Sequence, residues 1–221
     1  FSRPNSNASG CGNDTATERA MVRKYIVDSV KYWATEYHID GFRFDLMGLI
    51  DVETMKAVRE ALNEINPEII IYGEGWSMDT KTVQDVQLAT QANASQLEGI
   101  AFFSDGIRDA IKGSSQEGNE TTKGYVNGGA SEDNKNKIAN GFKGRADWTN
   151  IPSQVINYAS CHDNYALWDK LCQSNADASE ADRIKMNKMA AAIIYTSQGV
   201  PFTMQGEELL RSKKNDDGTY N

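Results

Sequence analysis

Short apolar segments alternate with longer amphipathic segments along this chain, and the alternation constrains the fold more than any other feature. The apolar segments that are typical of strands lie at residues 41–45, 69–72, 100–103, 155–160 and 200–204. Segments with apolar residues three and four positions apart, the spacing of a helix face, lie at residues 15–37, 51–65, 106–112 and 179–198. Such alternation predicts an α/β fold, a parallel sheet with helices packed outside it.

Single residues in these segments predict helix starts and buried faces. Asp51 is a plausible N-cap for the helix at residues 51–65, and Ser179 opens the helix at residues 179–198. The apolar face of residues 15–37 includes Trp33 and Tyr37. The apolar side of residues 51–65 includes Val52, Met55, Val58 and Leu62. The apolar run at residues 69–72, which contains Ile70, is typical of a parallel strand that is buried on both faces.

The number of strand and helix units suggests part of a closed barrel. A (β/α)8 TIM barrel has eight such units and takes about 250 residues. Only about five units are recognisable in the 221 residues, so we expect the later part of a barrel, about strands 4 to 8. Residues 113–150 are rich in Gly, Asn, Ser and Lys, which predicts an irregular insertion or long loop.

Charge and composition exclude several classes of function. The 31 acidic and 23 basic residues give a formal net charge of -8, which does not suit nucleic acid or an anionic membrane. No apolar run approaches the roughly 20 residues that span a bilayer. The chain opens on Phe1 without a signal pattern, and a targeting segment could have preceded it. The three cysteines are too few and scattered for a disulfide framework.

The segment at residues 41–45 places charged residues inside an apolar strand. Phe42 and Phe44 alternate with Arg43 and Asp45, so the aromatic rings are expected to face the helices while the charged side chains face the barrel interior. Asp45 ends this strand. In barrels of this kind the C-terminal strand ends carry the functional groups, although a purely structural ion pair of Arg43 with Asp45 is an equally good interpretation of this strand alone.

Two further strands end in the same way. Glu74 follows the strand at residues 69–72 between two glycines, and His162 with Asp163 follows the strand at residues 155–160. A glutamate in a loop or a lone histidine often has a structural role. Three strand ends that present Asp45, Glu74 and the His162–Asp163 pair to one barrel mouth nevertheless predict an active site.

The stretches that contain these residues resemble conserved regions of the alpha-amylase family of glycoside hydrolases, family 13. Residues 41–48 resemble its second region, residues 72–76 its third and residues 159–164 its fourth. Two details resemble the debranching subgroup, the type I pullulanases: Leu46-Met47-Gly48 after the aspartate, and Trp76 after Gly-Glu-Gly. Further similarities to this subgroup are Asn164, residues 167–169 and the segment 198–208.

The resemblance implies hydrolysis of alpha-1,6-glucosidic branch linkages in pullulan, starch or glycogen-type alpha-glucans. The implied mechanism is a retaining double displacement, in which Asp45 is the nucleophile and Glu74 the general acid and base. Arg43 would keep Asp45 ionised, Asp163 would bind sugar hydroxyls and favour ring distortion, and His162 would donate a hydrogen bond to the substrate.

Four other residues are candidates for substrate binding. Trp76, Tyr165 and Trp168 could stack on sugar rings, although aromatic residues in such loops are as often packing anchors. Asn164 follows Asp163 directly in the fourth region. We include all four in the predicted substrate site.

The first conserved region of the family has no counterpart in these 221 residues. His38 precedes the strand at residues 41–45 and belongs at the opposite end of the barrel. Residues 1–221 are therefore expected to form one partial catalytic barrel domain that requires the upstream part of the same domain as a partner. An open half-barrel exposes strand edges and lacks part of its substrate site, so we expect the isolated chain to be inactive.

Several alternatives remain open from the sequence. The chain could belong to an alpha-1,4-acting amylase or neopullulanase-like enzyme, or to a catalytically silent relative that only binds glucan. Asp45, Glu74 and Asp163 could instead hold Mg²⁺, although Arg43 would compete with the metal. A zinc site is a further alternative, whose spacing matches no usual pattern; its ligands would be Cys161, His162 and Cys172.

The resemblance also bears on cofactors and location. No cofactor is required for a double displacement by two carboxylates. Calcium binding is common in the family, but no ligand set identifies a site here. Because the implied substrate is a large polysaccharide, a secreted or cell-surface bacterial enzyme is expected.

Overall fold

The computed structural model describes residues 5–78, 80, 86–116 and 118–214. The chain divides into two compact units, Phe1–Phe103 and Ser104–Asn221, which we call the N-terminal unit and the C-terminal unit. Each unit has strands and helices of its own. Within the described residues no helix is both long enough and apolar enough to cross a membrane.

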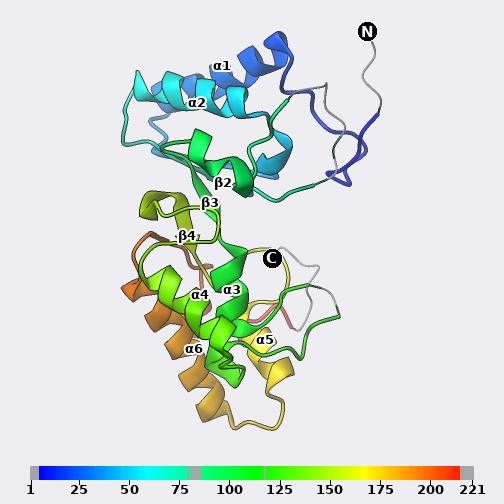
Figure 1. Ribbon diagram of the computed structural model, residues 1–221, viewed down its shortest axis with the longest axis vertical. Coiled ribbons are helices and arrows are strands. Elements are labelled where there is room, and N and C mark those ends of the chain that lie inside the picture. The colour runs from blue at the N-terminus through cyan, green and yellow to red at the C-terminus, as the bar shows by residue number, and fades with distance from the viewer. Residues whose placement is uncertain (1–4, 79, 81–85, 117, 215–221) are drawn as a thin grey trace. The chain divides into compact units, whose positions relative to one another are not determined.

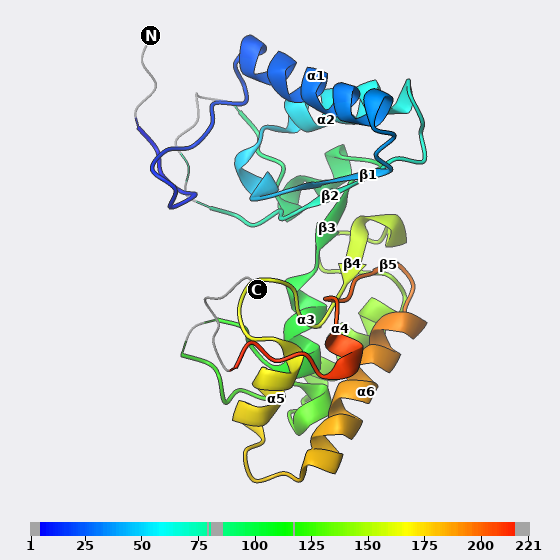
Figure 2. The same ribbon diagram turned by 180° about the vertical axis from the view of Figure 1, so that it is seen from behind.

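The N-terminal unit is built on three parallel strands, β1 (Gly41–Phe44), β2 (Ile70–Gly73) and β3 (Ala101–Phe103). In the register of β1 and β2, Arg43 lies opposite Tyr72 and Phe44 lies opposite Gly73. The helices α1 (Ala20–Glu36) and α2 (Val52–Asn63) lie side by side over one face of β1 and β2 (Figure 1 and Figure 2). The short 3-10 helices η1 (Met47–Leu49) and η2 (Gln91–Gln96) complete the unit.

Helix α2 agrees closely with the sequence. Asp51 is its N-cap and accepts a hydrogen bond from the Thr54 backbone N–H at 3.0 Å, because a carboxylate satisfies an amide that has no partner within the helix. The predicted apolar side is buried at Val52, Met55, Val58 and Leu62. This face anchors the helix to the core of the unit.

Helix α1 departs from its predicted burial. The sequence suggested one buried face that includes Trp33 and Tyr37, but these side chains are 45% and 57% exposed. Their rings and that of Tyr32 contact one another, whereas the buried residues of α1 are Val30 and Ala34. The spacing correctly predicted a helix, but Trp33 and Tyr37 do not belong to its buried face.

The C-terminal unit contains two short parallel strands among helices (Figure 2). The strands are β4 (Val155–Asn157) and β5 (Val200–Pro201). The α-helices are α3 (Asp105–Lys112), α4 (Glu132–Phe142), α5 (Leu167–Ser174) and α6 (Glu180–Thr196). The unit also contains the short 3-10 helices η3 (Tyr125–Asn127), η4 (Pro152–Gln154) and η5 (Glu207–Leu209). The apolar core of the unit includes Ile107, Ile111, Leu167, Leu171, Ala190 and Ile194.

Helix α4 corrects the expectation that residues 113–150 are irregular throughout. Ser131 accepts a hydrogen bond from the Asn134 N–H at 3.1 Å and caps the helix. Only Ile138 and Gly141 are buried on it, and a Cβ atom on Gly141 would lie 2.1 Å from Ile107 Cδ1. A helix that contacts the core through so few residues leaves little apolar periodicity in the sequence.

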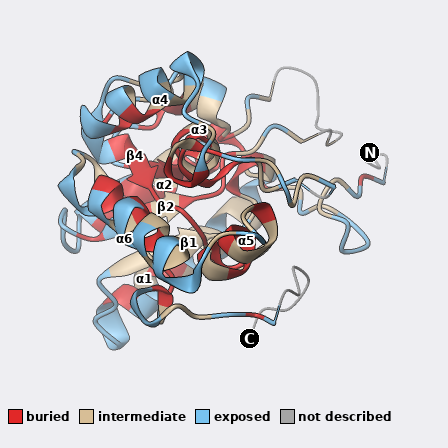
Figure 3. Ribbon diagram, turned by 90° about the horizontal axis from the view of Figure 1, so that it is seen from below, coloured by how far each residue is buried: buried red, intermediate tan, exposed pale blue. Residues whose placement is uncertain are grey.

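The start of the last helix agrees with the sequence, whereas the last two strands are shorter than predicted. Ser179 caps α6 by accepting from the Asp182 N–H at 3.1 Å, as expected. Figure 3 shows buried and exposed sides on α6, and the buried side includes Ala190, Ile193 and Ile194. The strands predicted at residues 155–160 and 200–204 are shorter than expected, because the chain leaves the sheet after Asn157 and Pro201.

Candidate active site

The N-terminal unit places two carboxylates at one end of its sheet. Asp45 directly follows β1 and Glu74 directly follows β2. Because Phe44 and Gly73 are register partners, the two acids leave neighbouring parallel strands at the same level. The Glu74 N–H continues the ladder with a 3.3 Å hydrogen bond to the Phe44 carbonyl. The predicted pairing of Asp45 with Glu74 at C-terminal strand ends is therefore found within this unit.

Arg43 joins the two carboxylates. Its Nη1 forms a short ion pair with Asp45 Oδ1, and its Nη2 lies 2.8 Å from Glu74 Oε1. The Asp45 side chain is 67% exposed, whereas the Glu74 side chain is 7% exposed. One guanidinium thus holds an accessible acid and a buried acid beside each other, as its fork of donors allows.

The backbone after β1 fixes the buried acid. The Leu46 N–H donates to Glu74 Oε2 at 3.0 Å, and the Gly48 N–H donates to the Glu74 carbonyl at 2.7 Å. Leu46 adopts a left-handed conformation with φ 44°, which turns the chain towards β2. Glu74 is consequently held by both its side chain and its main chain.

Two glycines make this close approach possible. A Cβ atom on Gly48 would lie 2.0 Å from the Trp76 carbonyl oxygen, and one on Gly75 would lie 2.4 Å from Phe102 Cδ1. No side chain fits at either distance. The Gly-Glu-Gly and Leu-Met-Gly patterns noted in the sequence therefore have a packing role around Glu74. Trp76, which follows Gly-Glu-Gly directly, is half-buried.

The second candidate cluster lies in the C-terminal unit, in the loop after β4. His162 Nε2 is 3.5 Å from Asp163 Oδ1, and both side chains are 41% exposed. Asn164 has a left-handed backbone with φ 60°, which bends the loop immediately after the pair. The structure thus presents His162 and Asp163 together on an accessible loop.

A buried lysine that sequence reasoning missed fastens this loop. Lys213 is 4% exposed, and its Nζ donates to the carbonyl oxygens of His162 at 2.9 Å and Asn164 at 2.7 Å. Its own N–H donates to Asp169 Oδ2 at 2.6 Å. Helix α5 therefore positions Lys213 through Asp169, and Lys213 positions the loop.

A second buried network supports the end of β4. The Tyr158 hydroxyl accepts a hydrogen bond from Arg108 Nη1 at 3.0 Å, and Arg108 also contacts Asp109 at 2.6 and 3.1 Å. Burial raises the pKa of Tyr158 above its ordinary value, so its hydroxyl stays neutral and can also donate. The contact of Arg108 with Tyr158 was not predicted, because it joins residues 50 positions apart.

The remaining aromatic candidates have other neighbours as well. The Trp168 indole carries the Arg183 guanidinium over its ring, 5.9 Å from the ring centre. Tyr165 lines a small cavity with Lys112 and Lys170. One face of Trp168 is therefore engaged in a cation–π contact.

The three residues of the alternative zinc site do not form one cluster. Among the described residues, Cys161 and His162 cluster with Asp163, and Cys172 is not a member of that group. Burial raises the pKa of the Cys161 thiol, which disfavours the thiolate that zinc requires. Asp45 and Glu74 also belong to no such group in the described part of the chain, where Arg43 occupies the space between them.

Known proteins match both units of this chain. The alpha-amylase catalytic-domain model matches residues 11–218. Pullulanase of Bacillus subtilis strain 168 is 40% identical over 217 residues, which are 97% of this chain and 30% of that protein. The crystal structure of a pullulanase from Anoxybacillus sp. LM18-11 complexed with maltotetraose has a TM-score of 0.92 at 44% identity, covering 98% of this chain and 31% of that one.

A third match has the same extent. The pullulanase from Paenibacillus barengoltzii in complex with maltohexaose and alpha-cyclodextrin has a TM-score of 0.91 at 43% identity, covering 97% of this chain and 34% of that one. This chain spans about 30% of the length of the relatives that it matches. The matches confirm the predicted α/β barrel class, and with a family model that accounts for nearly all of its residues, the chain belongs to the alpha-amylase catalytic-domain family.

Proposed function

We propose that the protein containing this chain hydrolyses alpha-1,6-glucosidic branch linkages in pullulan, starch or glycogen-type alpha-glucans. The observation that carries the proposal is the Arg43 guanidinium between Asp45 and Glu74 at the ends of two neighbouring strands. Pullulanases at 40–44% identity support the linkage type. Two of them are solved with maltooligosaccharides, which supports a glucan as substrate.

Asp45 is the nucleophile in this proposal. A nucleophile must reach the anomeric carbon, and the exposed Asp45 carboxylate is open to a sugar ring. Arg43 stabilises its negative charge before attack. The carboxyl groups of a retaining glycosidase lie about 5–5.5 Å apart, and a single guanidinium that contacts both is compatible with such a separation.

Glu74 is the general acid and base. Its buried carboxyl group is oriented by the Leu46 N–H, so one oxygen is fixed and the group cannot rotate freely. Orientation of this kind is what proton transfer to the leaving glycosidic oxygen requires. After the glycosyl-enzyme forms, the same group takes a proton from water, as retention demands.

The loop after β4 supplies the remaining roles. Asp163 binds sugar hydroxyls and favours the distorted ring, and His162 donates a hydrogen bond that strengthens as charge develops. Lys213 is a positioning residue, since its Nζ donates to backbone carbonyls of this loop. Asn164, Trp76, Tyr165 and Trp168 are proposed to contact the glucan outside the reacting bond.

The test is product analysis on pullulan and on linear amylose with the intact gene product. We expect trisaccharide from pullulan, little release from amylose, and a loss of about 1,000-fold or more in kcat for Asp45→Asn. Asp28→Asn is the matched control, because Asp28 is exposed on α1 and pairs with Lys24. The first anomer released should be alpha, by proton NMR at early times.

Three outcomes would redirect the assignment. Strong attack on amylose would favour an alpha-1,4-acting enzyme of the same family. No release from either glucan, with binding retained, would favour a silent glucan-binding protein. An unchanged rate in Asp45→Asn would rule out Asp45 as the nucleophile of a double displacement.

We also propose that the 221-residue chain alone releases little sugar and needs the upstream part of its domain, since the relatives are about three times longer.

The proposed setting is a secreted or cell-surface bacterial enzyme. A polymeric glucan does not cross a membrane intact, so an enzyme that uses it is expected outside the cell. The bacterial origin of several matching pullulanases supports the proposal. Fractionation of the producing cells with a pullulan assay would test it.

A further inference from the structure

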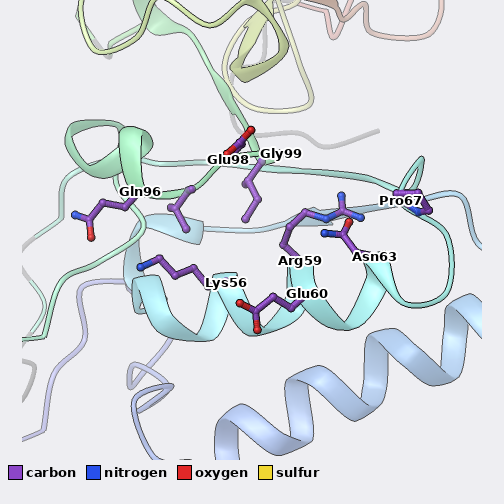
Figure 4. Close-up of a pocket in the computed structure, with 10 residues that line it drawn as sticks. Lys56, Arg59, Glu60, Asn63, Pro67, Gln96, Glu98 and Gly99 are labelled. Carbon is purple, nitrogen blue, oxygen red and sulfur yellow. The ribbon is translucent and has the colours of Figure 1, made fainter.

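The N-terminal unit contains a cavity of about 480 Å³ that the proposed reaction does not use. It lies between helix α2 and the segment at residues 96–100 (Figure 4). Ile69 and Ile100 directly precede β2 and β3, whereas Asp45 and Glu74 follow β1 and β2. Within this unit the cavity is therefore at the end of the strands opposite to the two carboxylates.

Arg59 is the residue that distinguishes this cavity. It is 9% exposed, and its Nη1 donates to the Ile69 carbonyl at 2.6 Å. Its Nε and Nη2 are buried without a hydrogen-bond partner. These two nitrogens form one edge of the guanidinium, from which two parallel N–H groups point in the same direction.

The surroundings keep this edge open. Gly99 has a left-handed φ of +76°, and a Cβ atom there would lie 3.1 Å from Arg59 Cδ, so glycine leaves room for the arginine stem. In Figure 4 the Arg59 side chain rises from α2 towards this segment, with Asn63 beside it. The hydrogen bond to Ile69 fixes the head group in that orientation.

The charge of Arg59 has no local counterpart. Glu60 and Glu98 also line the cavity, but both are exposed, and in Figure 4 their carboxyl groups point away from the guanidinium. No carboxylate of the described residues lies within ion-pair distance of Arg59, although nearby Lys56 pairs with Glu53 at 3.0 Å. Burial lowers the pKa of Arg59, as expected for a desolvated cation without a partner.

A buried donor without an acceptor is costly, and buried polar groups are normally paired. An oxyanion would satisfy both free N–H groups of Arg59 and neutralise its charge in one contact. Bidentate pairing of this kind is the preferred contact of arginine with carboxylate and phosphate. We propose that this cavity binds a small oxyanion, a carboxylate or phosphate group, through Nε and Nη2 of Arg59.

The first test is calorimetric titration of the intact protein with sodium phosphate and, separately, with sodium acetate, against sodium chloride at equal ionic strength. We expect saturable binding of at least one oxyanion and a loss of about tenfold or more in affinity for Arg59→Gln. Lys24→Gln is the matched control, because it removes one cation from exposed α1 and should bind as the unchanged protein does. Phosphate and acetate affinities then identify which oxyanion chemistry the site prefers.

The second test does not depend on how the variant folds. Crystals of the unchanged intact protein are soaked in sodium selenate, a tetrahedral oxyanion with anomalous scattering. A difference peak within hydrogen-bond distance of Arg59 Nε and Nη2 is the expected result. The proposal is overturned by an empty edge at saturating selenate, by the absence of oxyanion binding in solution, or by equal affinity in a folded Arg59→Gln variant. None of these results depends on whether the protein cleaves glucans.

Discussion

The two units hold their candidate catalytic groups in different ways. In the N-terminal unit, Asp45 and Glu74 are aligned by the strand ladder itself and joined by Arg43, which is part of β1. In the C-terminal unit, the loop with His162 and Asp163 leaves a strand of only three residues and is fastened by Lys213, about 50 positions later. The first arrangement is local and determined by the sheet, whereas the second depends on a distant side chain.

This difference suggests a division of tasks. Bond cleavage requires two carboxylates at a fixed separation. Adjacent strands fix this separation and allow the carboxylates little movement. Binding of sugar hydroxyls tolerates adjustment, and a loop anchored through its backbone carbonyls can provide that. Substitutions in the N-terminal unit should therefore affect kcat most, and those around Lys213 should be milder.

After Asp45→Asn, the largest effect is expected for Arg43→Met. It removes the cation that contacts Asp45 and Glu74 and leaves two carboxylates beside each other without compensation. We expect kcat on pullulan to fall by roughly 100-fold or more, with partial recovery in Arg43→Lys. Steady-state kinetics of both variants checks this. A change confined to KM would mean that Arg43 contributes to binding alone.

Gly48→Ala should have the next largest effect, a loss in the free energy of unfolding. A Cβ atom at this position would lie 2.0 Å from the Trp76 carbonyl oxygen, so the turn that holds Glu74 must move at a cost of about 3 kcal/mol. Urea unfolding of the intact protein measures it. Gly106→Ala is the control, since a Cβ atom there meets nothing within 4 Å. If both alanine variants lose the same free energy of unfolding, the packing argument around Glu74 is wrong.

Lys213→Met should give the smallest of these effects. The variant removes the donor to the His162 and Asn164 carbonyls, so the loop loses its anchor while the two carboxylates of the N-terminal unit keep theirs. We expect a rise in KM of about tenfold, a smaller fall in kcat, and recovery in Lys213→Arg. Lys214→Met, an exposed neighbour, should match the unchanged protein. Equal losses in kcat and stability without a rise in KM would contradict the positioning role.

Features set by local chemistry could be predicted from the sequence. Asp51 and Ser179 are the helix caps that the sequence indicated, because capping depends on residues within one helical turn. Asp45 and Glu74 were expected at strand ends because parallel strands share one C-terminal edge. Both lie there within the N-terminal unit.

Features set by distant contacts could not be predicted. Lys213 has no local pattern that would distinguish it from exposed Lys214, since its partners lie 44 to 51 positions away. Ile70 was expected to be buried within β2 but is 54% exposed. Helix α4 was missed because polar residues occupy most of its length. Periodicity shows that a face is apolar, and it does not show what covers that face.

The unequal exposure of Asp45 and Glu74 has a consequence for inhibition. An electrophilic sugar that arrives from solvent meets the open carboxylate first, while the other acid is screened by Arg43 and by the Leu46 amide. Irreversible inactivators should therefore be designed around attack by Asp45, with the reactive carbon placed where a glucosyl ring would sit. Reagents that depend on esterifying Glu74 would have to open the turn at Gly48 first.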